Sequence, residues 1–544
     1  MRPGPSAPWL PRPARLLTLV LLVASLVAGL ARQPVAGAGA SGGTVRQALP
    51  ETSYALAQRA PFNRPEHYPI EQRPDPTLYR PHATWMGRLI LPKASELGPP
   101  DSTLPRDWVW LQLEQTPPEQ AELLGRRLRL TWQETPELLG MVRTVTTDIH
   151  LGEAARAASE SGNVVPTRLD GRRLVGPLQS LAGARPQDDI SVQLDRLELD
   201  STAAGEPLLR IGRPPVQITG RWTALVKILG PAASGRGNPT ASAKGGMAAG
   251  SDLTGGDRFR VRHFDSRTGR FEGPTETVRI PTPAPGRVGR RVVVPRGIAP
   301  SPGGREGWYL HGSPDATGLF TVQALEPRLL TQVRADRSLN GTAAGLRHIL
   351  HGNWRDTPLQ RGLISRVALR PDNGRRSLLS RRGTANGWQI GDEALVIHGF
   401  GGIGGAQGEP VTGFTVTGHF AFGQARVIAD PFSGEPRFAI LYHQIYANNP
   451  NGIVSGTQDW SAFSGDLQRG WLGTRPISDV LVEGDGPLLR ELAIQAEVLM
   501  ARYRSGDGTG VSTVTPSTSC VQDSSQALYI AIDRLRRRAA EDPG

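Results

Sequence analysis

The chain has almost no cysteine. Cys520 is the single cysteine among 544 residues, so an internal disulfide is excluded and the fold must be held together by burial. The sequence also contains no Cys-x-x-Cys pair, no His-Glu-x-x-His motif and no other spaced cluster of cysteine and histidine. Those are the patterns that bind structural or catalytic zinc. We therefore expect neither a metal site nor a metal cofactor.

Lysine is nearly as scarce. Only three of the 62 basic residues are lysines, and the arginines are spread along the chain without forming a block. A dispersed arginine bias gives the formal net charge of +12 without building a basic patch, so we expect no nucleic-acid partner. The alternative interpretation of the same charge is that an exported basic protein adheres to anionic lipid or to a cell-wall polymer.

After its first forty residues the chain has no second long hydrophobic run. The first forty have the order of an export signal: Arg2, Arg12 and Arg15 precede an uncharged and largely apolar run from Leu16 to Ala31, and Ala-x-Ala sites follow between Ala36 and Ala40. The run is short for a membrane span, which needs roughly 20 residues. We predict that residues 1–40 are a signal peptide or an N-terminal anchor, and that the protein is exported, either periplasmic or anchored in the membrane.

The fold class expected from the pattern is α+β. Short runs that alternate apolar and polar residues between Pro and Gly turns predict antiparallel strands in small barrels or sandwiches, and two stretches rich in Gly, Ala, Ser or Pro predict linkers. A strand meander followed by helices ends the chain. The predicted segments are a β-rich domain at 41–230, a linker at 231–256, further strands at 257–280, a linker at 281–307, a mixed region at 308–384 and an α+β domain at 385–544.

One glycine-rich segment matches the sequence pattern of a dinucleotide-binding site but lacks the helix that such a site requires. Gly399 to Gly404 matches G-x-G-x-x-G and follows an apolar strand. A dinucleotide site also needs a helix immediately after the glycines, because the N-terminus of that helix holds the pyrophosphate. Here the segment leads into another strand, so we expect no nucleotide and no other cofactor.

Cys520 stands where a helix is predicted to begin. Val521, Leu528 and Leu535 recur at helical spacing, and Ser519 with Gln522 forms a capping-box pattern. The free N–H groups and the positive end of a helix dipole favour a thiolate over a thiol. Cys520 is therefore a candidate nucleophile. The alternative is that it is a small buried hydrophobic residue.

His419 is the candidate general base. It lies on a predicted strand whose neighbouring positions on its face are small (Ala421, Gly423, Ala425), which leaves room for a substrate. The turn from Asp430 to Gly434 predicts a hairpin. If that turn is centred near Ser433, His419 lies opposite Ala447, which places Asn449 diagonally beside it and His443 on the same face. Asn449 or His443 would then orient the imidazole, whereas the alternative for His419 is a histidine that only hydrogen-bonds in the core.

The order of these elements resembles that of the circularly permuted papain-like hydrolases. In that group a histidine on a strand precedes a cysteine at a helix start, and the activities include peptidases, amidases and acyl transferases. The resemblance covers about 130 residues from His419 onward. It implies a C-terminal papain-like, permuted domain of strands and helices in which Cys520 acts as nucleophile.

A second resemblance covers more of the chain. Gly418 to Gly423, Gln444 to Asn449, Leu467 to Pro476 and Ser519 to Gln526 look like the extracytoplasmic part of bacterial proteins called predicted CAAX (Abi) family proteases. Those proteins are named for a membrane-embedded glutamate/histidine metalloprotease domain. This sequence has no Glu-Glu pair and no transmembrane bundle after Cys520, so that chemistry is not carried over to any residue here.

Two functions follow as expectations. The first is an exported protease or amidase that uses Cys520 and His419 on a peptide or amide substrate. The second is a non-catalytic accessory or binding module that associates with a CAAX-family membrane protease. An accessory module has no need of an activated cysteine, so thiol reactivity distinguishes the two.

Overall fold

The computed structural model confirms a β-rich α+β protein, in which most of the described strands belong to two large sheets. The predicted signal peptide or anchor at 1–40 lies outside the described residues. The described residues are 64–93, 96, 107–148, 174–183, 190–202, 205–232, 257–281, 304–333, 338–348, 364–369, 388–401, 409–410, 416–449, 452–467, 477–483, 486–505 and 520–541.

The larger sheet joins strands from both ends of the chain. Its order is β16-β17-β23-β18-β20-β21-β22-β10-β7-β2-β3-β4-β9-β8, with β19 paired to β20. The two halves meet at β10, which pairs antiparallel with β7 and parallel with β22 through Gln217 and Gln458. The strands are β2 (Met86–Ile90), β3 (Val109–Gln115), β4 (Arg127–Trp132), β7 (Ile190–Gln193), β8 (Leu197–Ser201), β9 (Pro207–Ile211), β10 (Val216–Gln217), β16 (Ser338–Asn340), β17 (Ile364–Leu369), β18 (Glu393–Gly401), β19 (Glu409–Pro410), β20 (Val416–Ala429), β21 (Pro436–Asn449), β22 (Gly452–Asp459) and β23 (Ile477–Glu483).

The smaller sheet closes on itself. β11 pairs with β12 and with β14, and β12-β13-β15-β14 completes the circuit, so five strands form a barrel with β1 added beside β11. In β12 every second side chain is buried, as the alternating sequence predicts. The inward residues include Val226, Val261 and Val322. The strands are β1 (Arg80–Pro81), β11 (Trp222–Pro231), β12 (Arg258–His263), β13 (Thr275–Arg279), β14 (Trp308–Pro314) and β15 (Phe320–Pro327).

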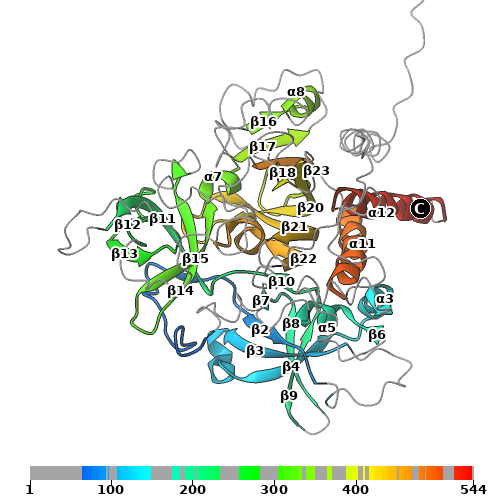
Figure 1. Cartoon of the computed structure of the whole chain (residues 1–544), viewed down its shortest axis with the longest axis horizontal. Coiled ribbons are helices and arrows are strands. Elements are labelled where there is room, and N and C mark those ends of the chain that lie inside the picture. Colours follow the sequence, from blue (N-terminus) through cyan, green and yellow to red (C-terminus); the bar gives the residue numbers. More distant parts are fainter. Residues whose placement is uncertain are drawn as a thin grey trace, which may run out of the picture.

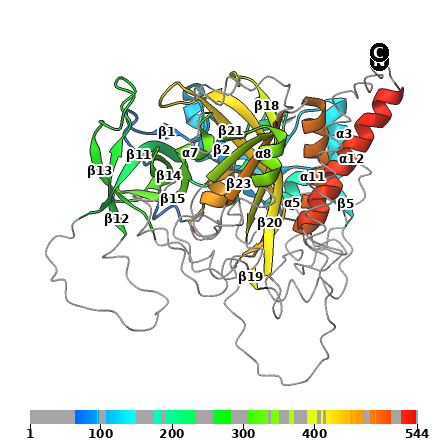
Figure 2. The ribbon, with the colours of Figure 1, turned by 90° about the horizontal axis from the view of Figure 1, so that it is seen from above.

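Helices cover one face of the C-terminal half of the larger sheet. α11 (Gly486–Ser505) and α12 (Cys520–Glu541) pack against each other and over β20 and β21, while the barrel lies on the other side of these strands (Figures 1 and 2). The apolar stripe of α12, with Leu528 and Ile532 buried, shares a core with Phe422 of β20. The shorter helices include η3 (Pro118–Leu123), α3 (Pro136–Val145), α5 (Pro177–Ala182), α7 (Arg328–Thr331), α8 (Thr342–Arg347) and η10 (Ser461–Gly465), and a separate two-stranded pair consists of β5 (Thr147–Asp148) and β6 (Leu174–Val175).

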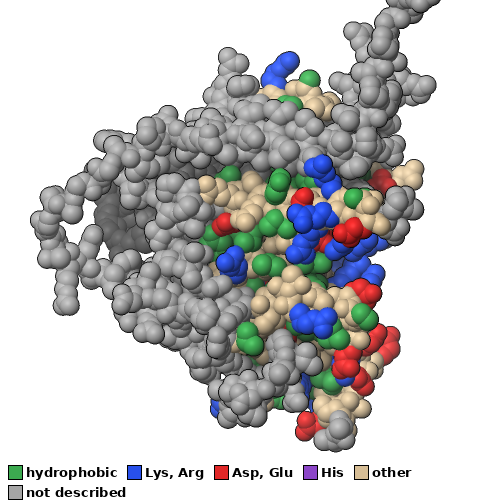
Figure 3. All heavy atoms as spheres, turned by 90° about the vertical axis from the view of Figure 1, so that its right-hand side faces the viewer, with side chains coloured by type: hydrophobic (Ala, Val, Ile, Leu, Met, Phe, Trp, Pro, Cys, Tyr) green, Lys and Arg blue, Asp and Glu red, His purple; other side chains and the backbone are tan. Residues whose placement is uncertain are grey.

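Arginines of α12 lie beside acidic residues. Arg534 and Arg538 both contact the buried carboxylate of Glu491 on α11, at 3.2 and 3.0 Å, and Arg537 pairs with Asp533 at 2.8 Å. Figure 3 shows the face that carries these helices, where basic and acidic side chains are intermixed. The positive net charge of the chain therefore does not produce an unbroken basic surface on this face.

Strand pairing spans both predicted linkers. β11 ends where the segment 231–256 begins, and its partner β12 follows that segment; β14 follows the segment 281–307 and pairs with β11 again. Most of both segments lies outside the described residues. Residues on either side of each segment therefore belong to one barrel. The segment 281–307 was predicted to separate the β-rich region from the mixed region that follows, but strands on both sides of it pair with β11.

This pairing yields a test of the two segments. We expect limited proteolysis to cut first within 231–256, which has little hydrophobic content to bury, or within 281–307, which is rich in Pro and Gly. The cut pieces should still elute together from a sizing column, since β11 remains hydrogen-bonded to β12 and β14. Mass spectrometry of the fragments locates the cuts. A first cut elsewhere, or separation of the pieces under native conditions, contradicts the prediction.

Candidate functional site

Cys520 is the first residue of α12, as its sequence context predicts. The body of α12 packs on α11, β20 and β21, and Figures 1 and 2 both draw its starting end beside β20. The candidate base His419 is on β20, where the backbone pairs it with Phe400 of β18. The side chains of Cys520, His419 and Asn449 lie outside the described part of the chain. The contact between the thiol and the imidazole therefore remains a prediction.

The predicted hairpin is present, but its register differs by one residue. β20 and β21 pair from Ala429 with Pro436 to Phe422 with His443. The centre of the turn therefore falls between Phe432 and Ser433. The cause is a loop in which Asp430 Oδ1 accepts backbone N–H groups of Phe432 and Ser433, at 2.9 and 2.7 Å. The turn is near Ser433 as expected, but the register that pairs His419 with Ala447 is off by one residue, and such a shift moves a side chain to the other face.

His443 consequently lies on the face covered by the helices. Its pairing partner Phe422 belongs to the core shared with α11 and α12, whereas Ala421 and Ala425 point into the core on the barrel side. His443 is 3% exposed, and its Nδ1 is 3.0 Å from Thr457 Oγ1. Burial lowers the pKa of His443 to about 4. It is therefore a neutral core histidine, and the role of orienting a base on the face of Ala421 does not fit it.

Asn449 pairs with Gly452 at the far end of β21. The pairing of β21 with β22 is irregular between Gln444 and Ala447, so the alternation of faces cannot be carried through that point by counting residues. The diagonal relation between Asn449 and His419 therefore remains a prediction.

A buried histidine and aspartate that no sequence motif marked lie on the neighbouring strands β18 and β23 of the larger sheet. His398 of β18 is directly opposite Asp479 of β23, both side chains are 0% exposed, and they are hydrogen-bonded through Nδ1 of the ring. The hydroxyl of Tyr442 donates to Asp479 Oδ2 at 3.2 Å, and its ring stacks on Phe463. An aspartate that orients a histidine is a catalytic arrangement. Here complete burial makes it part of the core.

A second histidine network joins the barrel to the larger sheet. Nε2 of His82 lies 2.7 Å from Asp459 Oδ2 and its Nδ1 lies 3.1 Å from the carbonyl of Gly220. Both partners are acceptors, so both ring nitrogens must carry hydrogen. Burial alone would lower the pKa of His82, but the charge of Asp459 and these hydrogen bonds outweigh it and raise the pKa. The ring stacks on His311, which contacts Glu326 at 3.0 Å.

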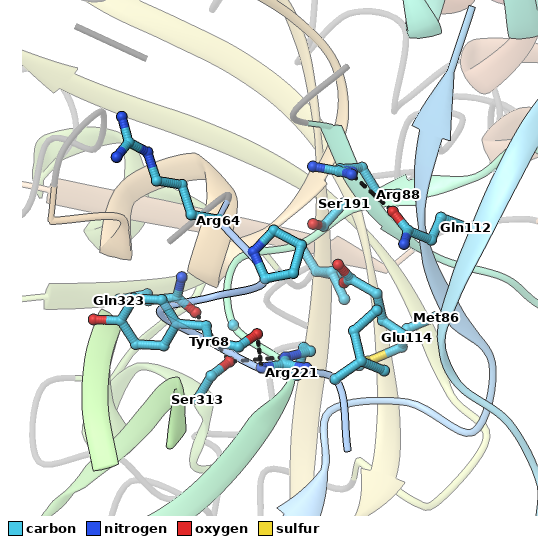
Figure 4. A pocket seen from close by; sticks show the side chains of 14 residues that line it. Arg64, Tyr68, Met86, Arg88, Gln112, Glu114, Ser191, Arg221, Ser313 and Gln323 are labelled. Atoms are coloured by element: carbon cyan, nitrogen blue, oxygen red, sulfur yellow. Dashed lines mark hydrogen bonds between the residues drawn. The ribbon is translucent and has the colours of Figure 1, made fainter. Parts of the chain in front are cut away.

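A polar pocket lies between the barrel and the N-terminal half of the larger sheet, with a volume of about 60 Å³. Its floor is one face of β2 and β3, which contributes Arg88 and Glu114, and its wall includes Arg221 and Ser313 from the barrel. Figure 4 shows these side chains converging from separate elements, with the Arg64 side chain directed away from the others. No motif in the sequence marked this pocket, since its lining comes from residues 64 to 323.

Comparison with known proteins adds no assignment: the chain matches no family model, no curated protein and no solved structure. Among the described residues, no helix is long and apolar enough to cross a membrane. The same residues contain no group of three or more His, Cys, Asp or Glu side chains arranged to hold a metal ion.

Proposed function

We propose that this chain is an exported cysteine-type hydrolase, a peptidase or amidase. The observation that supports the proposal is that Cys520 is the first residue of α12, where the free N–H groups and the positive end of the helix dipole favour a thiolate. In this proposal His419 takes up the proton of the Cys520 thiol, the thiolate attacks the substrate carbonyl, and His419 delivers the proton to the leaving amine. Water, deprotonated by His419, then hydrolyses the thioester and releases the acid, and the proton returns to the thiol. N–H groups in the first turn of α12 stabilise the oxyanion, and Asn449 orients the imidazole.

The second candidate is a non-catalytic accessory module that binds a membrane protease or its substrate. The described cavity favours it, because the pocket between barrel and sheet is lined by arginine, glutamine, serine and glutamate side chains and contains no cysteine or histidine. The loss of His443 from the predicted constellation favours it too. Both candidates share the proposal that the N-terminal segment exports the protein to the periplasm or anchors it in the membrane.

Thiol reactivity tests the two candidates directly, since Cys520 is the only thiol. A free cysteine with a pKa of about 8.5 is only a few per cent thiolate at neutral pH. If the helix start and His419 lower the thiol pKa, Cys520 should react with iodoacetamide about tenfold faster than free cysteine, allowing for the lower nucleophilicity of a more acidic thiol. Mass spectrometry of the alkylated protein over time gives the rate.

Two variants complete this test. His419→Ala should slow the alkylation, because the imidazolium partner is lost, whereas His67→Ala should not, because His67 is an exposed histidine outside both sheets. Cys520→Ala should abolish hydrolysis of peptide or amide substrates with little effect on the fold, since the side-chain volume changes little. An ordinary rate that His419→Ala leaves unchanged eliminates the hydrolase and leaves the accessory module.

A further inference from the structure

The pocket between the barrel and the larger sheet contains a buried arginine without an acidic partner in contact. Arg221 is 8% exposed and lines the pocket. Its guanidinium donates to Ser313 Oγ at 3.1 Å and to the carbonyls of Tyr68 and Pro69 at 3.1 and 3.0 Å. All three acceptors are neutral. No carboxylate of the described residues forms an ion pair with Arg221, and burial lowers its pKa. Such a charge favours an anion nearby.

The floor of the pocket supplies a second guanidinium. Arg88 of β2 faces Gln112 of β3 and Ser191 of β7 in the strand register, and its Nη2 donates to Gln112 Oε1 at 2.7 Å. Glu114 lies two residues further along β3 on the same face, and its charge acts on Arg221 through space. Figure 4 shows Arg88 and Arg221 on different sides of the space that these residues surround.

The charges and the size of the pocket restrict its ligand. Arg64 also lines the pocket, but its side chain is directed away from the others. Of the remaining charged side chains, Arg88 and Arg221 contribute two positive charges and Glu114 one negative charge, so a single negative charge balances these three. A phosphate carries about −1.5 to −2 at neutral pH, so Glu114 would repel it more strongly than it repels a monoanion. A volume of about 60 Å³ holds roughly four waters, or a carboxylate with one or two carbons attached. Guanidinium groups also match the planar geometry of a carboxylate.

We propose that this pocket binds the terminal carboxylate of a small organic molecule or peptide. Arg88 and Arg221 bind the carboxylate oxygens, and Glu114 makes the pocket selective for a monoanion. The pocket shares no residue with the proposed hydrolase, and its ligand is detected by binding alone. The proposal is therefore independent of whether Cys520 is catalytic.

Calorimetric titration of the full chain at constant ionic strength tests the proposal with four probes. N-acetylglycine presents a peptide-like terminal carboxylate, acetate a small acid, N-acetylglycinamide the neutral counterpart, and inorganic phosphate the dianion. We expect saturable binding of N-acetylglycine, no binding of the amide and at least tenfold weaker binding of phosphate. Acetate that binds as tightly as N-acetylglycine identifies a small acid as the ligand, and weaker acetate binding identifies a peptide terminus.

Variants of the floor keep the test decisive, because Arg221 also holds backbone carbonyls and its replacement could unfold the protein. Arg88→Gln should weaken binding of N-acetylglycine about tenfold, the loss of one charge-assisted hydrogen bond. Glu114→Gln should tighten binding of N-acetylglycine and of phosphate. Arg213→Gln, at an exposed arginine, should change nothing. Equal binding of the amide, preference for phosphate in the native protein, or an affinity unaffected by Arg88→Gln overturns the proposal.

Discussion

Replacing His82 by leucine is expected to lower the free energy of unfolding by about 3–5 kcal/mol, since it leaves a largely buried carboxylate without its counter-charge. The His82 and Asp459 side chains are 8% and 16% exposed and 2.7 Å apart. Among the described residues, the hydrogen bonds that remain to Asp459 after the substitution come from Ser461 and from the backbone of Ala462. Urea unfolding followed by tryptophan fluorescence measures the change.

The pH dependence of this effect has a definite sign. The pKa of His82 is raised from 6.5 in the folded protein, so its stabilising contribution is complete below about pH 6.5 and is lost as the pH rises through the folded pKa. The pKa of Asp459 is lowered from 3.8, chiefly by His82 against the opposing effect of burial. Its contribution is present above about pH 3.8 and is lost as the pH falls through the folded pKa. The difference between native and His82→Leu protein should be greatest between these limits.

Two controls isolate the ion pair. His67→Leu changes an exposed histidine and should leave the unfolding curve unchanged. Adding Asp459→Asn to His82→Leu removes the isolated charge, so the double variant should regain part of the lost stability. A loss below about 1 kcal/mol for His82→Leu, outside the range for a broken buried pair, or a loss that does not vary with pH, contradicts the assignment of a charged pair.

Local features of the fold could be predicted from the sequence because they depend on neighbours in the chain. The alternation in β12 and the start of α12 at Cys520 are examples, and so is the hairpin around Asp430. The register of that hairpin was missed by one residue, because side-chain hydrogen bonds of Asp430 set the loop length. Strand periodicity carries no information about such bonds.

Contacts between distant segments could not be predicted in the same way. His82 and Asp459 are 377 residues apart, and β10 joins the halves of the larger sheet through Gln217 and Gln458. Neither pair has a spacing that a single sequence reveals. His398 did carry a signal, because an ionisable residue at the end of an apolar run on a buried strand requires a buried partner. The identity of that partner, Asp479, depended on the pairing of β18 with β23.

In the candidate site, too, the features set by local sequence could be predicted, and those set by strand register or by distant segments could not. The helix start at Cys520 was predicted correctly from its capping pattern and apolar spacing, and the assignment of a strand to His419 was correct as well. The relation of His443 to that strand was wrong, because it depended on the register of the hairpin. The pocket with Arg88 and Arg221 was not foreseen, since it forms only where the barrel meets the larger sheet.

The second large effect is expected at Asp479, a buried carboxylate to which both His398 and Tyr442 are hydrogen-bonded. Asp479 and His398 are both completely buried and hydrogen-bonded to each other, and Tyr442 donates to the same carboxylate. The charge of Asp479 also supports Arg366, whose pKa burial lowers to about 9. Asp479→Ala should lower the free energy of unfolding by about 3–5 kcal/mol, because it removes the anion from a cluster that stays buried.

Matched substitutions separate the loss of charge from the loss of packing. Asp479→Asn keeps the volume and an acceptor for Tyr442 but removes the charge. It should therefore lower the free energy of unfolding relative to the native protein, but by less than Asp479→Ala does. Asp195→Ala breaks an exposed ion pair with Arg213, and exposed pairs contribute little to stability. Urea unfolding should therefore show the largest loss of stability for Asp479→Ala, a smaller loss for Asp479→Asn and the smallest for Asp195→Ala. If Asp479→Ala behaves like Asp195→Ala, the carboxylate does not hold β18, β21 and β23 together, and the core must be stabilised by the aromatic packing around Tyr442 alone.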